Sequence, residues 1–332
     1  MESMLYWWYG INRCGLVFIK KLLGLVPLNP FVANFLMLLT AFLFLIFLSF
    51  IFYSLSLKFN LKPKGIFILP CVFIAQPLLA EQFNFTLQTF EISFAFLLMF
   101  LSVYLVTKWI FDQKLGLYLI LSALLLAWSF SCYQAVIFLY VTVALSVFIF
   151  IYINNLKNNA NIFCEIFFRA AAIKYLLTFF GSFILCALVN FSVQRLFKIK
   201  IDYVNNMVLW GKEPFFKCLE GVLSYVKQTI LGDGLFYSKF LLIILLMASF
   251  VFLKFLFFKE ENNKNKILYL LAFLAFIGSP YFLAIFLGIS LIPRMQFSYQ
   301  FVMAFVLFIF VNNFLNSYVL KRLIIFFSIF WI

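Results

Sequence analysis

The chain has 332 residues, of which 67% are hydrophobic and 11% are charged, and its mean hydropathy is +1.12. Because soluble globular domains average about 25% charged residues, this composition excludes a soluble domain and indicates a membrane protein. The net charge of +14 comes from Lys and Arg at the ends of apolar segments, where such residues meet anionic lipid head groups. This distribution argues against a nucleic-acid partner. Because the sequence has no His, any acid–base chemistry must use Asp, Glu, Lys, Tyr or Cys.

The first 30 residues differ from the rest of the chain. A helix needs about 20 apolar residues to cross the hydrocarbon core, and residues 1–30 contain no such run. Arg13, Lys20 and Lys21 interrupt the apolar residues, several of which fall on one helical face. We therefore predict an amphipathic segment that lies on the membrane surface, with Lys20 and Lys21 as interfacial anchors.

From residue 31 onward, long apolar runs alternate with short polar connections. They predict an all-α, polytopic integral membrane protein in which residues 31–332 form one domain of about nine transmembrane helices. The expected spans are 31–57, 65–80, 89–107, 114–131, 135–153, 172–193, 239–258, 267–289 and 297–318. The second span is short and contains Pro70 and Pro77, which we expect to kink it.

The charges of the connections predict which side of the membrane each one occupies. Loops rich in Lys and Arg stay in the cytoplasm. This rule assigns 58–64, 108–114, 154–170, 259–266 and 319–322 to the cytoplasm. It places 1–30, 81–88, 129–134, 194–238 and 290–296 outside. The outer set contains the longest loop, 194–238, and most of the acidic residues, so we expect the protein to work at its extracytoplasmic face.

The outer connection between the second and third spans holds two carboxylates. Ionisable groups walled by apolar sequence at a membrane boundary are candidates for function. A carboxylate at such a rim has a raised pKa and can act as a general base, which makes Glu81 the catalytic candidate. The structural alternative is that Glu81 only caps a helix end. Glu91 begins the third span, where the helix dipole favours a carboxylate, so we expect a structural role for it.

Five stretches resemble the glucosyltransferase II family of multi-pass bacterial enzymes, which modify O-antigen and related surface polysaccharides. They are Ile11-Asn12-Arg13-Cys14-Gly15-Leu16, Glu81-Gln82-Phe83-Asn84-Phe85-Thr86-Leu87-Gln88, Ser131-Cys132-Tyr133-Gln134-Ala135, Asn205-Asn206-Met207 with Trp210-Gly211, and Pro293-Arg294-Met295-Gln296. The resemblance implies a GT-C-like fold in the bacterial cytoplasmic membrane. It also implies transfer of glucose from a polyprenyl-phosphate carrier to a polysaccharide or lipid-linked glycan at the outer face. In that fold a span and an acidic outer loop come first, and we expect this chain to lack both.

The matching stretches supply candidate substrate-binding residues. Arg13 and Arg294 suit the carrier phosphate, because a guanidinium pairs with phosphate oxygens in a bidentate manner. Lipid head-group anchoring is the alternative for both. Gln88, Tyr133, Gln134 and Trp210 are candidates for hydrogen bonding to the sugar or stacking on it, although Tyr and Trp are common at membrane interfaces for physical reasons alone. Asp202 and Asp233 could hold a divalent cation together with Glu81, since hard cations prefer oxygen ligands, but no spacing supports a metal site.

Three other functions are also consistent with the sequence. A transporter or flippase for lipid-linked oligosaccharide would place polar residues within its spans, and few are visible here. A polysaccharide polymerase belongs to the same enzyme class. The chain would be an inactive remnant if the main catalytic acid belongs to the span and acidic loop that we expect it to lack.

Overall fold

The computed structural model describes residues 2–26, 29–59, 65–84, 87–112, 116–157, 165–199, 206–233, 237, 239–256 and 263–314. In this part of the chain every named element is a helix, as the composition predicts. The elements are α1 (Glu2–Gly10), α2 (Cys14–Leu22), α3 (Pro30–Lys58), α4 (Ile68–Ile74), α5 (Pro77–Phe83), α6 (Thr89–Asp112), α7 (Leu117–Cys132), α8 (Val136–Lys157), α9 (Glu165–Leu196), α11 (Phe215–Leu231), α12 (Leu241–Leu256), α13 (Asn263–Gly278), η1 (Ser279–Tyr281), α14 (Phe282–Leu287), η2 (Pro293–Met295) and α15 (Phe297–Phe314).

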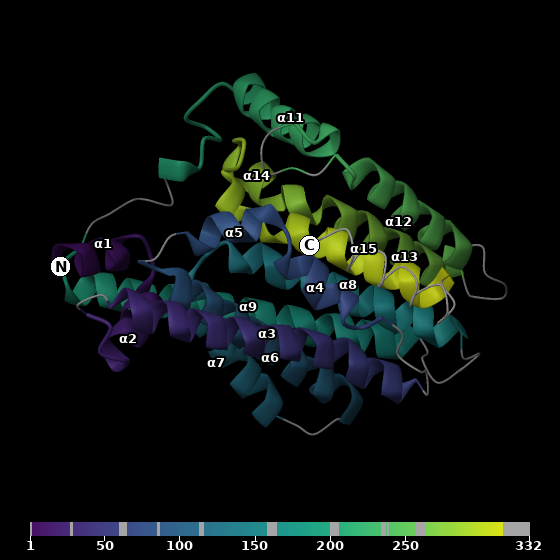
Figure 1. Cartoon of the computed structure of the whole chain (residues 1–332), viewed down its shortest axis with the longest axis horizontal. Helices are drawn as coiled ribbons and strands as arrows, with labels where there is room; N and C mark the ends of the chain where they lie inside the picture. Colours follow the sequence, from purple (N-terminus) through teal and green to yellow (C-terminus); the bar gives the residue numbers. More distant parts are fainter. Residues whose placement is uncertain are drawn as a thin grey trace.

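The long helices lie side by side along the longest axis of the molecule, with α1 and α2 at one end (Figure 1). On one side of the bundle α3 packs against α6, α6 against α7 and α7 against α9. On the other side α15 packs against α4, α8 and α12. The helix α11 lies along an edge of this arrangement (Figure 1).

Six helices in the described residues are long and apolar enough to cross a membrane. These segments are Pro30–Lys58, Thr89–Phe111, Val136–Asn155, Arg169–Leu196, Lys266–Leu287 and Phe297–Phe314. The helices α7 and α12 are apolar but have 16 residues each. The prediction of an all-α membrane protein is confirmed, and the expected count of about nine spans stays a prediction.

The prediction of a single span at 65–80 is wrong. The structure has two helices of seven residues there, α4 and α5, and each is too short to cross the hydrocarbon core. Pro77 is the cause, because proline lacks a backbone N–H and disfavours helical geometry in the residue before it. Gln76 accordingly takes an extended conformation, with ψ of 133°. The break makes α5, which carries Glu81, a separate helix from α4.

Phenylalanine fills the interior of the bundle. Phe44 of α3 makes ring contacts with Phe96 and Phe100 of α6, with centroids 5.5 Å and 6.0 Å apart, and with Phe73 of α4. Edge-to-face and offset pairs of this kind stabilise a core beyond the area they bury. Other apolar side chains face outward, as Phe31 does with 87% of its surface exposed. An apolar exterior of this extent suits contact with lipid.

The described parts of the two regions predicted not to span the membrane contain helices. In residues 1–30, α1 packs against α9 and α2 packs against α7, and their position on the membrane surface stays a prediction. In the predicted loop 194–238, α9 continues to Leu196 and α11 occupies 17 residues. The helix α11 ends at Gly232, whose φ of 69° is a left-handed conformation that glycine adopts readily.

Candidate functional site

Glu81 lies on α5, which packs against η2 and the residues around Arg294. The Glu81 carboxylate accepts a hydrogen bond from the backbone N–H of Arg294. Burial raises the pKa of Glu81 above its ordinary value, and the positive charge of Arg294 opposes this shift. The Oε2 atom of Glu81 is buried and has no hydrogen-bond partner among the described residues. This oxygen is therefore able to accept a proton.

Arg13 joins the first turn of α2 to two other helices. Its Nη1 atom donates a hydrogen bond of 2.5 Å to Oε1 of Gln88, which directly precedes α6. Its guanidinium carbon lies 4.7 Å from the ring centroid of Tyr133, which directly follows α7. The Tyr133 hydroxyl in turn lies 3.5 Å from the carbonyl oxygen of Arg294. Contacts thus run from Arg13 through Tyr133 to Arg294 and Glu81.

Two glutamines hold the turn that presents Arg13. Asn12 adopts a positive φ of 63°, which a non-glycine residue rarely takes. Gln134 donates from Nε2 to the carbonyl oxygens of Ile11 and Asn12, at 2.6 Å and 3.1 Å. Gln194 of α9 donates from Nε2 to Asn12 Oδ1 at 2.9 Å and to the carbonyl oxygens of Tyr9 and Gly10 at 3.1 Å and 3.2 Å. Gln134, predicted to contact substrate, therefore makes its observed contacts with backbone and positions Arg13.

A buried ion pair fixes α2 to α6. Lys20 and Glu91 form this pair, and their side chains are only 4% and 1% exposed. The prediction that Lys20 anchors the protein to lipid head groups is therefore wrong, whereas Lys21 is exposed. Lys20 follows Leu16 by four positions and shares its helical face, so the pattern of α2 contained a signal for its burial. Glu91 does lie in the first turn of α6, as its predicted role at the helix dipole requires.

Trp210 occupies a different part of the molecule. Its Nε1 atom donates a hydrogen bond of 2.6 Å to the carbonyl oxygen of Ile285 in α14. Its ring packs on Gly288, where a Cβ atom would lie 3.0 Å from the indole. The helix α14 is clearly separated from α1 in Figure 1. Trp210 thus packs against α14 and against Phe215, the first residue of α11.

The structure tests the possible metal ligands only in part. Asp202 lies outside the described residues. Asp233 is exposed in the turn after α11. In the described part of the chain no group of three or more His, Cys, Asp and Glu residues could hold a metal ion.

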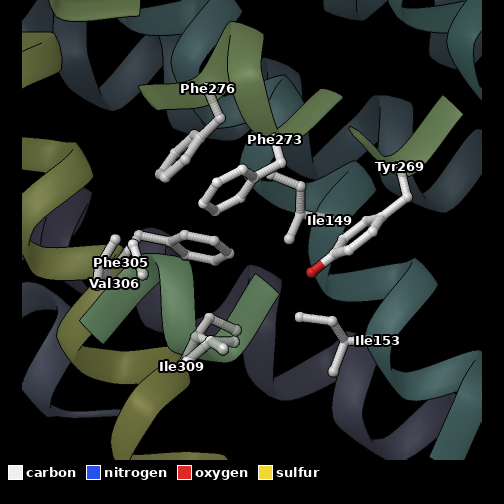
Figure 2. A pocket seen from close by; sticks show the side chains of 10 residues that line it. Ile149, Ile153, Tyr269, Phe273, Phe276, Phe305, Val306 and Ile309 are labelled. Carbon is white, nitrogen blue, oxygen red and sulfur yellow. The ribbon is translucent and has the colours of Figure 1, made fainter. Parts of the chain in front are cut away.

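A small cavity inside the bundle has a different character. It measures about 20 Å³, and its lining is apolar apart from the Tyr269 hydroxyl. Figure 2 shows the side chains that converge on it from α8, α13 and α15. They include Ile149, Ile153, Tyr269, Phe273, Phe276, Phe305, Val306 and Ile309. Such a cavity offers nothing to a sugar or a phosphate, so the polar residues around Arg13 and Glu81 are the better candidate site.

The comparisons with known proteins identify a family for the chain. A family model described as Glucosyl transferase GtrII matches residues 3–312, which is most of the chain. The resemblance read from five short stretches is therefore confirmed. No curated protein and no solved structure matches the chain. The matched range includes all seven candidate residues, from Arg13 to Arg294.

Proposed function

The chain belongs to the GtrII glucosyl transferase family, and from this we propose that it transfers glucose from a polyprenyl-phosphate carrier to a cell-surface polysaccharide. We place the reaction at the extracytoplasmic face of the bacterial cytoplasmic membrane. One observation carries the proposal: Arg13, Glu81 and Arg294 come from distant parts of an apolar chain and meet in one connected group.

Arg13 and Arg294 are proposed to bind the phosphate of the carrier. Phosphate recognition favours arginine, whose planar guanidinium offers several N–H donors in a fixed geometry. The hydrogen bond to Gln88 and the contact with the Tyr133 ring hold the Arg13 guanidinium in position for this role. Positive charge at this position would stabilise the phosphate as it leaves with the bonding electron pair.

Glu81 is proposed as the general base. In the reaction, an acceptor hydroxyl oxygen forms a bond to the anomeric carbon of glucose while the bond from that carbon to the phosphate oxygen breaks. The hydroxyl proton passes to the Glu81 carboxylate, and the polyprenyl phosphate departs. A raised pKa brings the proton affinity of this carboxylate closer to that of a useful base at neutral pH. Its unpartnered buried oxygen supports the assignment.

An apolar groove between α3 and α4 suits the hydrocarbon tail of the donor. The groove measures about 460 Å³. It is lined by Phe42, Leu45, Ile46, Ser49, Phe50, Tyr53, Ile66, Pro70, Cys71 and Ile74. The helix α4 continues into α5 after the break at Pro77, so an isoprenoid chain in the groove would lead towards the helix that carries Glu81. Burial of an apolar chain against such side chains is favourable.

The predicted orientation supports the extracytoplasmic assignment. Segments predicted to lie outside from the distribution of Lys and Arg are in contact with one another. Residues 11–13 contact residue 88 and residues 133–134, and residue 133 contacts residue 294. Connections on one side of a membrane can meet in this way, whereas connections on opposite sides cannot.

The proposal is tested with the protein reconstituted in lipid vesicles, using labelled polyprenyl-phosphate glucose and polysaccharide from the native host. Without its general base the Glu81→Gln variant should lose about 10²–10⁴-fold of the transfer rate. The Arg294→Ala variant should lose about 10²-fold, because the leaving phosphate loses a charge partner.

Matched controls are available on exposed surfaces. Glu220→Gln on α11 and Arg195→Ala in the last turn of α9 make the same chemical changes at exposed positions, and both should keep the parent rate. Retention of full transfer by Glu81→Gln would remove the base assignment. A parent chain that moves the labelled lipid across the bilayer without transferring glucose would instead be a flippase.

A further inference from the structure

Six tyrosine and glutamine side chains lie between α11, η1 and the start of α15. They form what we call the amide–phenol cluster: Tyr225, Tyr237, Tyr281, Tyr299, Gln296 and Gln300. Gln296 donates from Nε2 to the Tyr237 hydroxyl at 2.7 Å, and the Tyr237 ring lies 5.9 Å from that of Tyr299. The rings of Tyr225 and Tyr281 are 5.8 Å apart. The charges of Tyr237 and Tyr299 act on the phenol of Tyr225, which puts the two pairs within electrostatic reach of each other. Gln300 follows Gln296 by four positions and so lies on the same side of α15.

The cluster has hydrogen-bonding capacity that the described residues do not use. The Tyr225 hydroxyl, Oε1 of Gln296 and both polar atoms of the Gln300 amide are buried without a hydrogen-bond partner among those residues. Tyr225 and Gln300 are fully buried, and Gln296 is 1% exposed. More than about 90% of buried polar groups in proteins are hydrogen-bonded, because leaving one unpaired is costly. Several such groups in one cluster indicate a site for a polar ligand.

The chemistry of the cluster favours a neutral polyol. Amides and phenols both donate and accept hydrogen bonds, as sugar hydroxyls do. Burial raises the pKa of Tyr225, and burial also raises that of Tyr237, so these phenols stay neutral and keep their protons. None of the six side chains carries a positive charge, so a phosphate would lack the cation it prefers.

The cluster lies next to the proposed base. The negative charge of Glu81 acts on the phenol of Tyr237, which places the two groups within electrostatic reach. Gln82 follows Glu81 on α5, is fully buried and has no hydrogen-bond partner at either amide atom in the described chain. The helix α5 packs against α15, so the helix that carries Glu81 and Gln82 contacts the helix that carries Tyr299 and Gln300.

Tyr299 of the cluster lies on the opposite face of α15 from Phe297, which packs against the arginine group. Tyr133 packs on Phe297 with ring centroids 5.8 Å apart, whereas Tyr237 packs on Tyr299. Residues two apart in an α-helix differ by about 200° around its axis. In a displacement at an anomeric carbon, the incoming hydroxyl and the leaving group occupy opposite sides of that carbon. With phosphate at the arginines, Tyr237 and Tyr299 are on the side where the acceptor must enter, and Gln296 and Gln300 lie between the two faces.

We infer that the amide–phenol cluster is the acceptor subsite, where the neutral sugar ring that carries the attacking hydroxyl binds. This inference rests on the proposed function for the direction of transfer. Gln300, Gln296 and Tyr225 hydrogen-bond the ring hydroxyls, while Tyr237, within electrostatic reach of Glu81, borders the ring and leaves the attacking hydroxyl in contact with Glu81. The attacking hydroxyl gives its proton to Glu81 as its oxygen bonds to the anomeric carbon and the phosphate leaves.

The test measures KM separately for the two substrates in reconstituted vesicles, using labelled polyprenyl-phosphate glucose and polysaccharide from a native host that lacks the gene. Tyr225→Phe removes only a hydroxyl, and Gln300→Met replaces the amide with an apolar group of similar size. Each should raise the KM for polysaccharide about tenfold, the effect of losing a hydrogen bond, with less than a twofold change in the KM for the donor. The control Tyr269→Phe deletes a buried hydroxyl at the apolar cavity and should match the parent.

Co-sedimentation of labelled polysaccharide with the vesicles separates this inference from the proposed function. If the parent transfers glucose and both variants keep its KM for polysaccharide, the subsite is wrong while the proposed function stands. If the parent does not transfer but binds polysaccharide at least tenfold more tightly than both variants, the subsite stands and the proposed function falls. Equal binding by parent and variants, or no binding at all, would overturn the inference.

Discussion

The middle of the bundle and the end that holds Arg13 achieve order in different ways. Around the small cavity of Figure 2, Tyr269 stacks on Tyr152 at 4.3 Å, and Phe305 lies 5.2 Å from Phe276. These contacts do not depend on the exact position of any single atom, and one apolar side chain can replace another of similar volume. At the other region, single hydrogen bonds fix single atoms, as Gln134 does for the turn before Arg13. The difference indicates that the bundle supplies rigidity and that a few polar contacts supply the site.

The largest effect should come from breaking the buried ion pair. Lys20→Met would leave the Glu91 carboxylate buried without its partner, which costs about 3–5 kcal/mol of unfolding free energy. We expect a large fall in the thermal unfolding midpoint in detergent at a fixed scan rate. The double variant Lys20→Met/Glu91→Leu removes both charges and should recover most of the lost stability. If the double variant unfolds as early as the single one, the pair does not hold α2 on α6.

An intermediate effect is expected at the turn that presents Arg13. Gln134→Leu removes the donor to the carbonyls of Ile11 and Asn12 but leaves the side-chain volume nearly unchanged. Displacement of Arg13 should lower the transfer rate about tenfold or more, because small errors in position are costly in catalysis. Gln228→Leu on the exposed surface of α11 is the matched control. Equal rates for parent and Gln134→Leu would show that the glutamine does not position the arginine.

The smallest effect should arise in the middle of the bundle. Phe305→Leu shortens a side chain that packs against Phe52 and Phe276. We expect a loss of about 1 kcal/mol in unfolding free energy, since the change keeps an apolar residue of similar size. The transfer rate and both KM values should stay at the parent level. A marked loss of transfer rate in this variant would contradict the view that the middle of the bundle contributes only to stability.

Much of the helical framework could be predicted from apolar periodicity. The runs at 31–57 and 89–107 correspond to α3 and α6 within a few residues, because their composition alone requires burial or lipid. The run at 65–80 was misread because a break at Pro77 and a kink give similar sequence patterns. The helix α11 was not predicted within the outer loop 194–238, because it is amphipathic and too polar to resemble a span.

The site was harder to predict than the helices. Unusual residues at the ends of spans marked Arg13, Glu81, Gln88, Tyr133 and Arg294 individually, and the structure joins them through contacts and coupling. Gln194 escaped notice because its partners in the turn at residues 9–12 precede it by more than 180 positions. Local pattern carries no information about such pairings, since they depend on how the helices pack.

The hydrogen bonds from Gln194 to the turn before Arg13 also fix an order of events during synthesis. The two segments are separated by 185 residues, and a ribosome adds about 5–20 residues per second. Gln194 is therefore synthesised on the order of 10–40 s after the turn that it holds, and Arg294 is synthesised later still. A nascent chain whose first helices are already inserted cannot hold Arg13 in place until most of the protein has been made. With the role proposed for Arg13, the chain would acquire transfer activity only late in translation, and an interrupted chain would leave an inactive membrane segment.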